Sequence, residues 1–158
     1  MSSDEERARR IATATRVFDK DLGTWDAKSE IFPAPGAAAI HQRGVAENRL
    51  VAGRWLVTDY RADSGYEGHG VYGWDDVKGQ YVGTWVDSMG GSIARSVGIW
   101  DPATSTMTYV TEAGDAPNVR RYREITRTIS DGVHVYENLV PAADGGEFLL
   151  IRIEYRRR

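Results

Sequence analysis

Two side chains near the middle of the sequence have the types and the spacing for proton transfer. His69 follows Glu67 by two residues in the segment 66–74, which predicts a strand. Residues two apart in a strand share a face, and a histidine beside a carboxylate can act as an oriented general base. The same pair is also typical of a half-exposed histidine beside a surface glutamate, so both interpretations stay open.

Asp87 is a third candidate for acid–base chemistry. The strand predicted over 80–88 places it on one face with Trp85 and Met89, a mixture that indicates a cavity wall. A carboxylate in an apolar cavity can serve as an acid or a base. Equally, an aspartate just before the pair Gly90–Gly91 can accept hydrogen bonds from a turn at the mouth of a barrel.

Aromatic and amide side chains on the other predicted strands would complete the wall. They combine apolar surface with a few hydrogen-bonding groups, which is the usual make-up of a small-molecule pocket. The residues expected to bind a ligand are Tyr72, Trp85, Met89, Tyr109, Tyr122, Tyr136 and Asn138.

The segment 119–129 carries a row of arginines. Arg121, Arg123 and Arg127 share one strand face, opposite the face of Tyr122. Such a row is usually a solvated outer face paired with carboxylates of a neighbouring strand. The alternative is an inward arginine that holds a ligand carboxylate through its planar fork.

No metal site and no cofactor are expected. The three histidines, His41, His69 and His134, fall on separate predicted strands, and the chain has no cysteine. Phosphate-binding loops, dinucleotide fingerprints and serine-hydrolase elbows are absent from the sequence.

The composition argues against several classes of binding partner. A net charge of −3 gives no basic footprint for nucleic acid or an anionic membrane, and no apolar run reaches membrane-spanning length. The charged start MSSDEERARR lacks the apolar core of a secretory signal. We expect a soluble, cytoplasmic protein that takes a small-molecule ligand or substrate.

The elements that must position these residues are one helix and many short strands in a single domain, 1–158. Ser3 and Glu6 have the spacing of a capping box, which predicts a helix over 3–20. From 23 to 158, short alternating runs between turn residues predict a mainly β, closed antiparallel up-and-down barrel of about 8–10 strands. The expected strands are 24–32, 38–49, 54–62, 66–74, 80–88, 92–100, 106–112, 119–129, 133–140 and 147–156.

Several segments carry a family likeness: LGTWDAKSEIFPAPG, VAENRLVAGRWL, YEGHGVYGWDDVKGQYVGTWVDSMGG and the closing IEYRRR. They resemble a bacterial domain-of-unknown-function family, DUF1579, which carries no established common activity. The run Gly23–Thr24–Trp25 is also similar to the signature of calycins, the barrels that include lipocalins, fatty-acid-binding proteins and nitrobindin-like proteins. That likeness implies that Trp25 plugs the closed end, under an arginine of the last strand: Arg152, Arg156 or Arg158. Nitrobindin-like barrels hold haem through one histidine near the chain's end, which points to His134, although the surrounding sequence does not follow their pattern.

The sequence therefore favours a barrel that binds a small, largely apolar or aromatic molecule. The alternative is a cofactor-free cyclase, isomerase or dehydratase acting on a hydrophobic, polyketide-like intermediate, with Glu67, His69 or Asp87 moving a proton. A barrel filled by its own side chains would instead be a structural module. The apolar helix face would cap one barrel end or pack on a second subunit, so a homodimer stays open.

Overall fold

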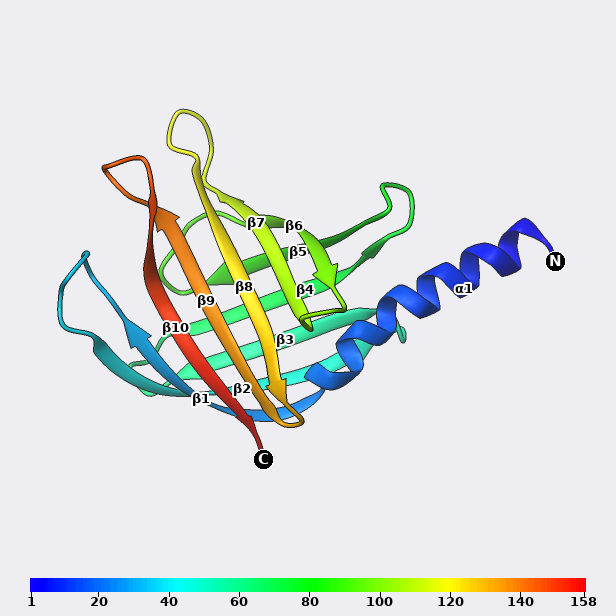
Figure 1. The fold of residues 1–158 in the computed structure, drawn as a ribbon, viewed down its shortest axis with the longest axis horizontal. Coiled ribbons are helices and arrows are strands. Elements are labelled where there is room, and N and C mark those ends of the chain that lie inside the picture. Colours follow the sequence, from blue (N-terminus) through cyan, green and yellow to red (C-terminus); the bar gives the residue numbers. More distant parts are fainter.

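Ten antiparallel strands close into one barrel in the computed structural model, which describes all 158 residues (Figure 1). Each strand pairs with its neighbours in the sequence, and β1 pairs with β10 to close the ring. The predicted mainly β, up-and-down barrel is confirmed. The strands are β1 (Gly23–Ile31), β2 (Ile40–Val51), β3 (Trp55–Ala62), β4 (Glu67–Asp75), β5 (Gln80–Asp87), β6 (Ala94–Asp101), β7 (Thr106–Ala113), β8 (Arg120–Ser130), β9 (Val133–Pro141) and β10 (Glu147–Arg157).

The helical segment before the barrel has two parts. The α-helix α1 (Ser3–Thr15) is followed by a 3₁₀ helix, η1 (Arg16–Asp21). The capping box of α1 lies one residue earlier than predicted. Ser2 is the residue with extended backbone, and its side chain accepts from the Glu5 amide. The Glu5 carboxylate in turn accepts from the Ser2 amide at 2.7 Å. The expected pair Ser3 and Glu6 is therefore wrong by one position.

The 3₁₀ helix closes one end of the barrel. Phe18 is 3% exposed and packs in a cluster with Leu56, Tyr81, Met107 and Tyr109. By contrast, α1 projects away from the barrel (Figure 1), and Arg7 and Arg10 tie it to Asp76 in the β4–β5 turn at 2.8 and 3.4 Å. Of the two expected roles of the apolar helical face, capping the barrel end is the one seen here.

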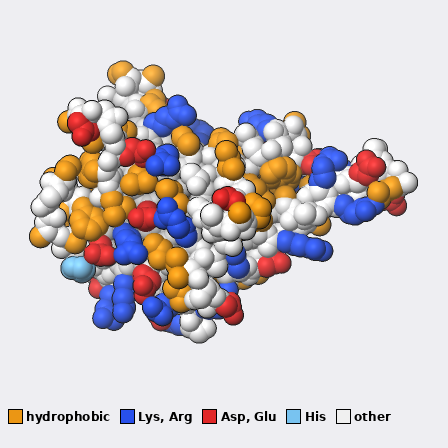
Figure 2. All heavy atoms as spheres, viewed as in Figure 1, with side chains coloured by type: hydrophobic (Ala, Val, Ile, Leu, Met, Phe, Trp, Pro, Cys, Tyr) orange, Lys and Arg blue, Asp and Glu red, His pale blue; other side chains and the backbone are white.

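Charged side chains cover the outer face of the last strands, as predicted for the arginine row. Arg123 lies 2.9 Å from Glu147, and Arg127 pairs with Glu137 on β9. Figure 2 shows basic and acidic side chains interspersed over the face formed by β8, β9 and β10. No helix is long and apolar enough to cross a membrane.

Glycines on the inward face make room for tyrosine rings on the neighbouring strand. Gly83 stands opposite Tyr72, and Gly98 stands opposite Tyr109. A Cβ atom at Gly83 would lie 2.3 Å from Cδ1 of Tyr72, and one at Gly98 would lie 2.5 Å from Cε1 of Tyr109. Each tyrosine ring therefore packs directly on the backbone of the facing glycine. A glycine within a strand permits this close approach because it has no side chain.

We expect Gly83→Ala to lower the free energy of unfolding by about 1–3 kcal/mol, because the added methyl forces the Tyr72 ring to move. Urea unfolding measures this change. Gly91→Ala is the matched control, since nothing lies within 4 Å of a Cβ atom there, and it should change stability by less than about 0.5 kcal/mol. Equal stability of the two variants would contradict the tight Gly83–Tyr72 contact.

Candidate functional site

A cavity of about 930 Å³ runs through the inside of the barrel. It reaches from Phe18 and Asp21 at the end closed by η1 to Ser64 and Met89 in the loops at the opposite end, the mouth. Nineteen of the 36 residues that line it are hydrophobic. A concave, mainly apolar space with scattered polar groups is the usual form of a small-molecule site.

All seven residues expected to bind a ligand line this cavity. They are Tyr72, Trp85, Met89, Tyr109, Tyr122, Tyr136 and Asn138. Met89 stands at the rim with 85% of its surface exposed, whereas Tyr109 and Asn138 are buried in the wall. Their part in binding a ligand stays a prediction.

Asp87 lies at the mouth and is held by four donors. The backbone amides of Met89 and Gly90 donate to Oδ1 at 2.9 and 3.0 Å. The Tyr66 hydroxyl and the Trp85 indole nitrogen donate to Oδ2, each at 3.0 Å. This matches the expectation of an aspartate that accepts from the turn after its strand. The Asp87 carboxylate thus links the turn after β5 to the side chains of Tyr66 and Trp85 at the mouth of the cavity.

His69 and Glu67 lie on the outer face of β4 and not on the cavity, which Tyr72 of the same strand faces. The expected pair of these two residues is not formed. His69 Nδ1 instead lies 2.7 Å from Oδ1 of Asp59, its direct partner on β3. Side chains directly opposite one another are about 4.5–5.5 Å apart at Cβ, closer than residues two apart along one strand. The neighbouring strand therefore supplies the carboxylate, and the pair is solvent-exposed.

Glu124 is the inward carboxyl group that sequence reasoning did not single out. It lies midway along β8 and lines the cavity. The Thr111 hydroxyl donates to Oε2 at 2.5 Å, and the Tyr136 hydroxyl donates to Oε1 at 2.7 Å. Burial raises the pKa of Glu124, and these two hydrogen bonds oppose the shift. The available signal was its alternation with Tyr122, on the strand face opposite Arg121, Arg123 and Arg127.

Tyrosines surround this carboxyl group. Tyr72, Tyr109, Tyr136 and Tyr155 all have a raised pKa, chiefly because burial disfavours the phenolate. Burial raises the pKa of Tyr122 to about 12. The Tyr72 and Tyr109 ring centroids are 5.5 Å apart. The wall thus presents neutral phenols, whose ring faces are available to an apolar or aromatic molecule.

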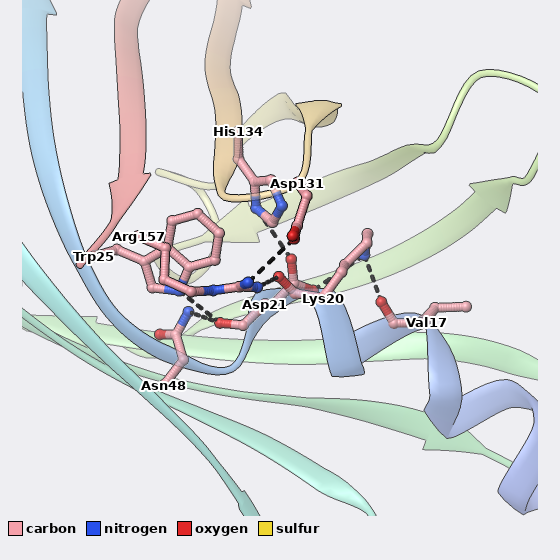
Figure 3. A network of polar contacts seen from close by, with 8 residues as sticks. All are labelled: Val17, Lys20, Asp21, Trp25, Asn48, Asp131, His134 and Arg157. Atoms are coloured by element: carbon pink, nitrogen blue, oxygen red, sulfur yellow. Dashed lines mark hydrogen bonds and ion pairs between the residues drawn. The ribbon is translucent and has the colours of Figure 1, made fainter.

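The closed end is built around Trp25, as the calycin likeness implied (Figure 3). Trp25 is 1% exposed, and its indole nitrogen donates to the carbonyl oxygen of Asp21 at 2.9 Å. The guanidinium of Arg157 lies 4.7 Å from the Trp25 ring. The arginine is therefore not one of the three expected, Arg152, Arg156 and Arg158. Trp25 pairs directly with Arg157 in the β1–β10 register, and the even-numbered arginines point outward.

His134 belongs to the same closed end (Figure 3). Its Nδ1 lies 3.2 Å from Oδ1 of Asp21, and its ring centroid lies 4.4 Å from that of Trp25. Burial lowers the pKa of His134 to about 4, helped by the charges of Lys20 and Arg157. Burial also raises the pKa of Asp21, which Lys20 opposes. The imidazole is thus neutral and packed into the fold.

Haem ligation through His134 stays a prediction of the nitrobindin likeness. Trp25 lies against the face of the His134 ring and Asp21 lies beside Nδ1. A buried structural histidine makes such contacts, and so does a histidine that binds a metal through Nε2.

The neutral state of His134 makes stability depend on pH. Its folded pKa of about 4 lies below the usual 6.5, so the unfolded chain takes up the proton first. The contribution is complete above pH 6.5 and is lost as the pH falls toward 4, by up to about 3 kcal/mol. Urea unfolding between pH 7 and 4 measures it against His134→Gln, which cannot titrate. Parallel pH profiles of the two proteins would show that the buried imidazole does not contribute in this way.

Comparisons with known proteins agree with this fold. The model of a family described as a protein of unknown function, DUF1579, matches residues 12–157. The crystal structure of Rv2717c from M. tuberculosis is similar with a TM-score of 0.70 at 13% sequence identity, covering 94% of this chain and 99% of that one. At this identity the likeness shows the fold alone. No curated protein matches the chain. Because the family model matches almost the whole length of the chain, the chain belongs to the DUF1579 family.

Proposed function

We propose that this barrel binds a small, largely apolar or aromatic molecule inside its cavity. The observation that carries the proposal is the cavity itself, about 930 Å³ with a mainly hydrophobic lining. Ligand pockets of proteins usually measure about 300–1,000 Å³ and have this kind of wall. A barrel filled by its own side chains, the structural alternative, would not leave such a space.

Hydrogen bonds and close packing hold the side chains of the wall and the mouth in place. The Trp85 indole nitrogen and the Tyr66 hydroxyl both donate to the Asp87 carboxylate at 3.0 Å, and the indole nitrogen also lies 3.1 Å from the Tyr66 hydroxyl. Tyr72 is fixed over Gly83 on the neighbouring strand. A preformed pocket spends little free energy on ordering its side chains, which supports tight binding of a small molecule.

Binding has more support than catalysis by the residues expected for proton transfer. His69 and Glu67 face solvent, and their charged partners are Asp59 and Arg61 on β3. Asp87 has its carboxylate oxygens occupied by four donors. An acid–base catalyst needs its group within reach of the substrate, and these three residues do not converge on one point of the cavity.

A bulky side chain inside the barrel should abolish binding, whereas the same side chain outside should not. Thr58 lines the cavity, and Thr84 is exposed on the outer face of β5. We expect N-phenyl-1-naphthylamine, an uncharged fluorophore, to brighten on the wild type and on Thr84→Trp but not on Thr58→Trp. At a hundredfold excess over its Kd, the fluorophore should also stabilise the first two proteins by about 2.7 kcal/mol.

Fluorescence titration and thermal unfolding measure the two effects. Absence of a signal with the wild type would refute binding of apolar molecules. An equal signal from Thr58→Trp, once circular dichroism shows that variant to be folded, would place the fluorophore outside the barrel.

A further inference from the structure

The middle of the cavity holds a carboxyl group that has no positive partner. Both donors to Glu124, the hydroxyls of Thr111 and Tyr136, are neutral. None of the ion pairs of the protein includes Glu124. Arg121, Arg123 and Arg127 of β8 pair with other carboxylates on the outer face, as Arg123 does with Glu147. Arg120, the first residue of β8, lines the cavity but forms no ion pair with Glu124. A buried carboxylate in this position needs either a proton or a cation.

Asn138 adds a second unsatisfied acceptor beside it. The Tyr136 hydroxyl gives its only hydrogen to Glu124, so it accepts from the amide nitrogen of Asn138, at 3.3 Å. This arrangement fixes the orientation of the amide. The oxygen Oδ1 of Asn138 is then left without a partner, although the residue is only 7% exposed and lines the cavity. A buried acceptor without a donor is costly, and a ligand that brings a donor removes the cost.

The aromatic wall also suits a positive charge. Tyr72, Tyr109, Tyr122 and Tyr155 line the same cavity, and the charge of Glu124 contributes to the raised pKa of each of them. Tyrosine ring faces attract ammonium groups, most strongly where water is excluded. The carboxylate, the free amide oxygen and the ring faces all favour a ligand that is cationic and donates hydrogen bonds.

We propose that the cavity recognises an amine, with its ammonium group between Glu124 and Asn138 and its apolar or aromatic body along the tyrosine wall. The proposal rests on the proposed function and specifies the chemical class of its ligand. Glu124 supplies the negative charge, and Asn138 Oδ1 accepts one of the ammonium hydrogens.

Binding of an amine should weaken as the pH falls. The residues around Glu124 are neutral: Tyr72 of β4, Tyr109 and Thr111 of β7, Tyr122 of β8, Tyr136 and Asn138 of β9, and Tyr155 of β10. Two basic residues, Arg120 at the start of β8 and Lys20 at the closed end, line the same cavity, and neither forms an ion pair with Glu124. Burial raises the pKa of Glu124, so a proton competes with the ammonium at acidic pH. An alkylammonium itself stays charged up to about pH 10.

The test compares two ligands of nearly equal shape, 3-phenylpropylamine and 3-phenylpropan-1-ol, by displacement of N-phenyl-1-naphthylamine at pH 5 to 8. On the wild type at neutral pH, the amine should bind about 10- to 100-fold more tightly than the alcohol. Glu124→Gln should remove this preference and its pH dependence while the alcohol binds as before. The control is Glu112→Gln, which changes an exposed carboxylate on the outer face of β7 and should leave the preference intact.

The comparison on the wild type decides the matter even if Glu124→Gln does not fold. If the alcohol binds as well as the amine or better, the amine proposal is overturned while the proposed function stands. A preference for the amine that survives in folded Glu124→Gln overturns the role of Glu124. If the fluorophore itself does not bind, the proposed function fails first.

Discussion

The pairing of β1 with β10 is the constraint on which the other features depend. It runs from Trp25 opposite Arg157 to Ile31 opposite Ile151 and leaves no free sheet edge. In a closed ring, a strand cannot slip by one residue without turning its inward side chains outward. Closure therefore holds Tyr122 and Glu124 of β8 inside and Arg121, Arg123 and Arg127 outside. The cavity, its mouth and its plugged end all follow from that fixed alternation.

Much of the fold was predictable because its signals are local. Turn residues bound each strand, and alternation on β5 correctly grouped Trp85 with Asp87. Apart from the capping box, what failed depends on which residues of paired strands stand opposite one another. The partner of His69 is Asp59, which only the β3–β4 register reveals. The arginine over Trp25 is Arg157, which only the β1–β10 register identifies.

The residues of the site also divide into those that local sequence signals predicted and those that only the fold reveals. The large aromatic residues made the cavity wall predictable, because aromatic side chains supply much of the buried apolar surface in such a barrel. Glu124 gave no comparable signal, since a glutamate within a basic strand is usually half of a surface ion pair. Its importance comes from what surrounds it, namely hydroxyls and phenols without a cation. The absence of an ion-pair partner can be recognised only when all the neighbours of a residue are known.

The attachment of α1 has a consequence for how the protein responds to ionic strength. Arg7 and Arg10 tie the helix to Asp76, and both arginine side chains are more than half exposed. Dissolved salt screens such pairs strongly. Phe18, which seals the barrel, lies in the 3₁₀ segment and is held by apolar contacts that salt does not weaken. Concentrated salt would therefore free the N-terminal turns of the helix. Its last turn would stay attached, because the Tyr81 hydroxyl donates to the Ala14 carbonyl at 2.9 Å and Ala14 packs against the Phe18 cluster. The ionic strength would change the position of the outer helix while the cavity kept its shape.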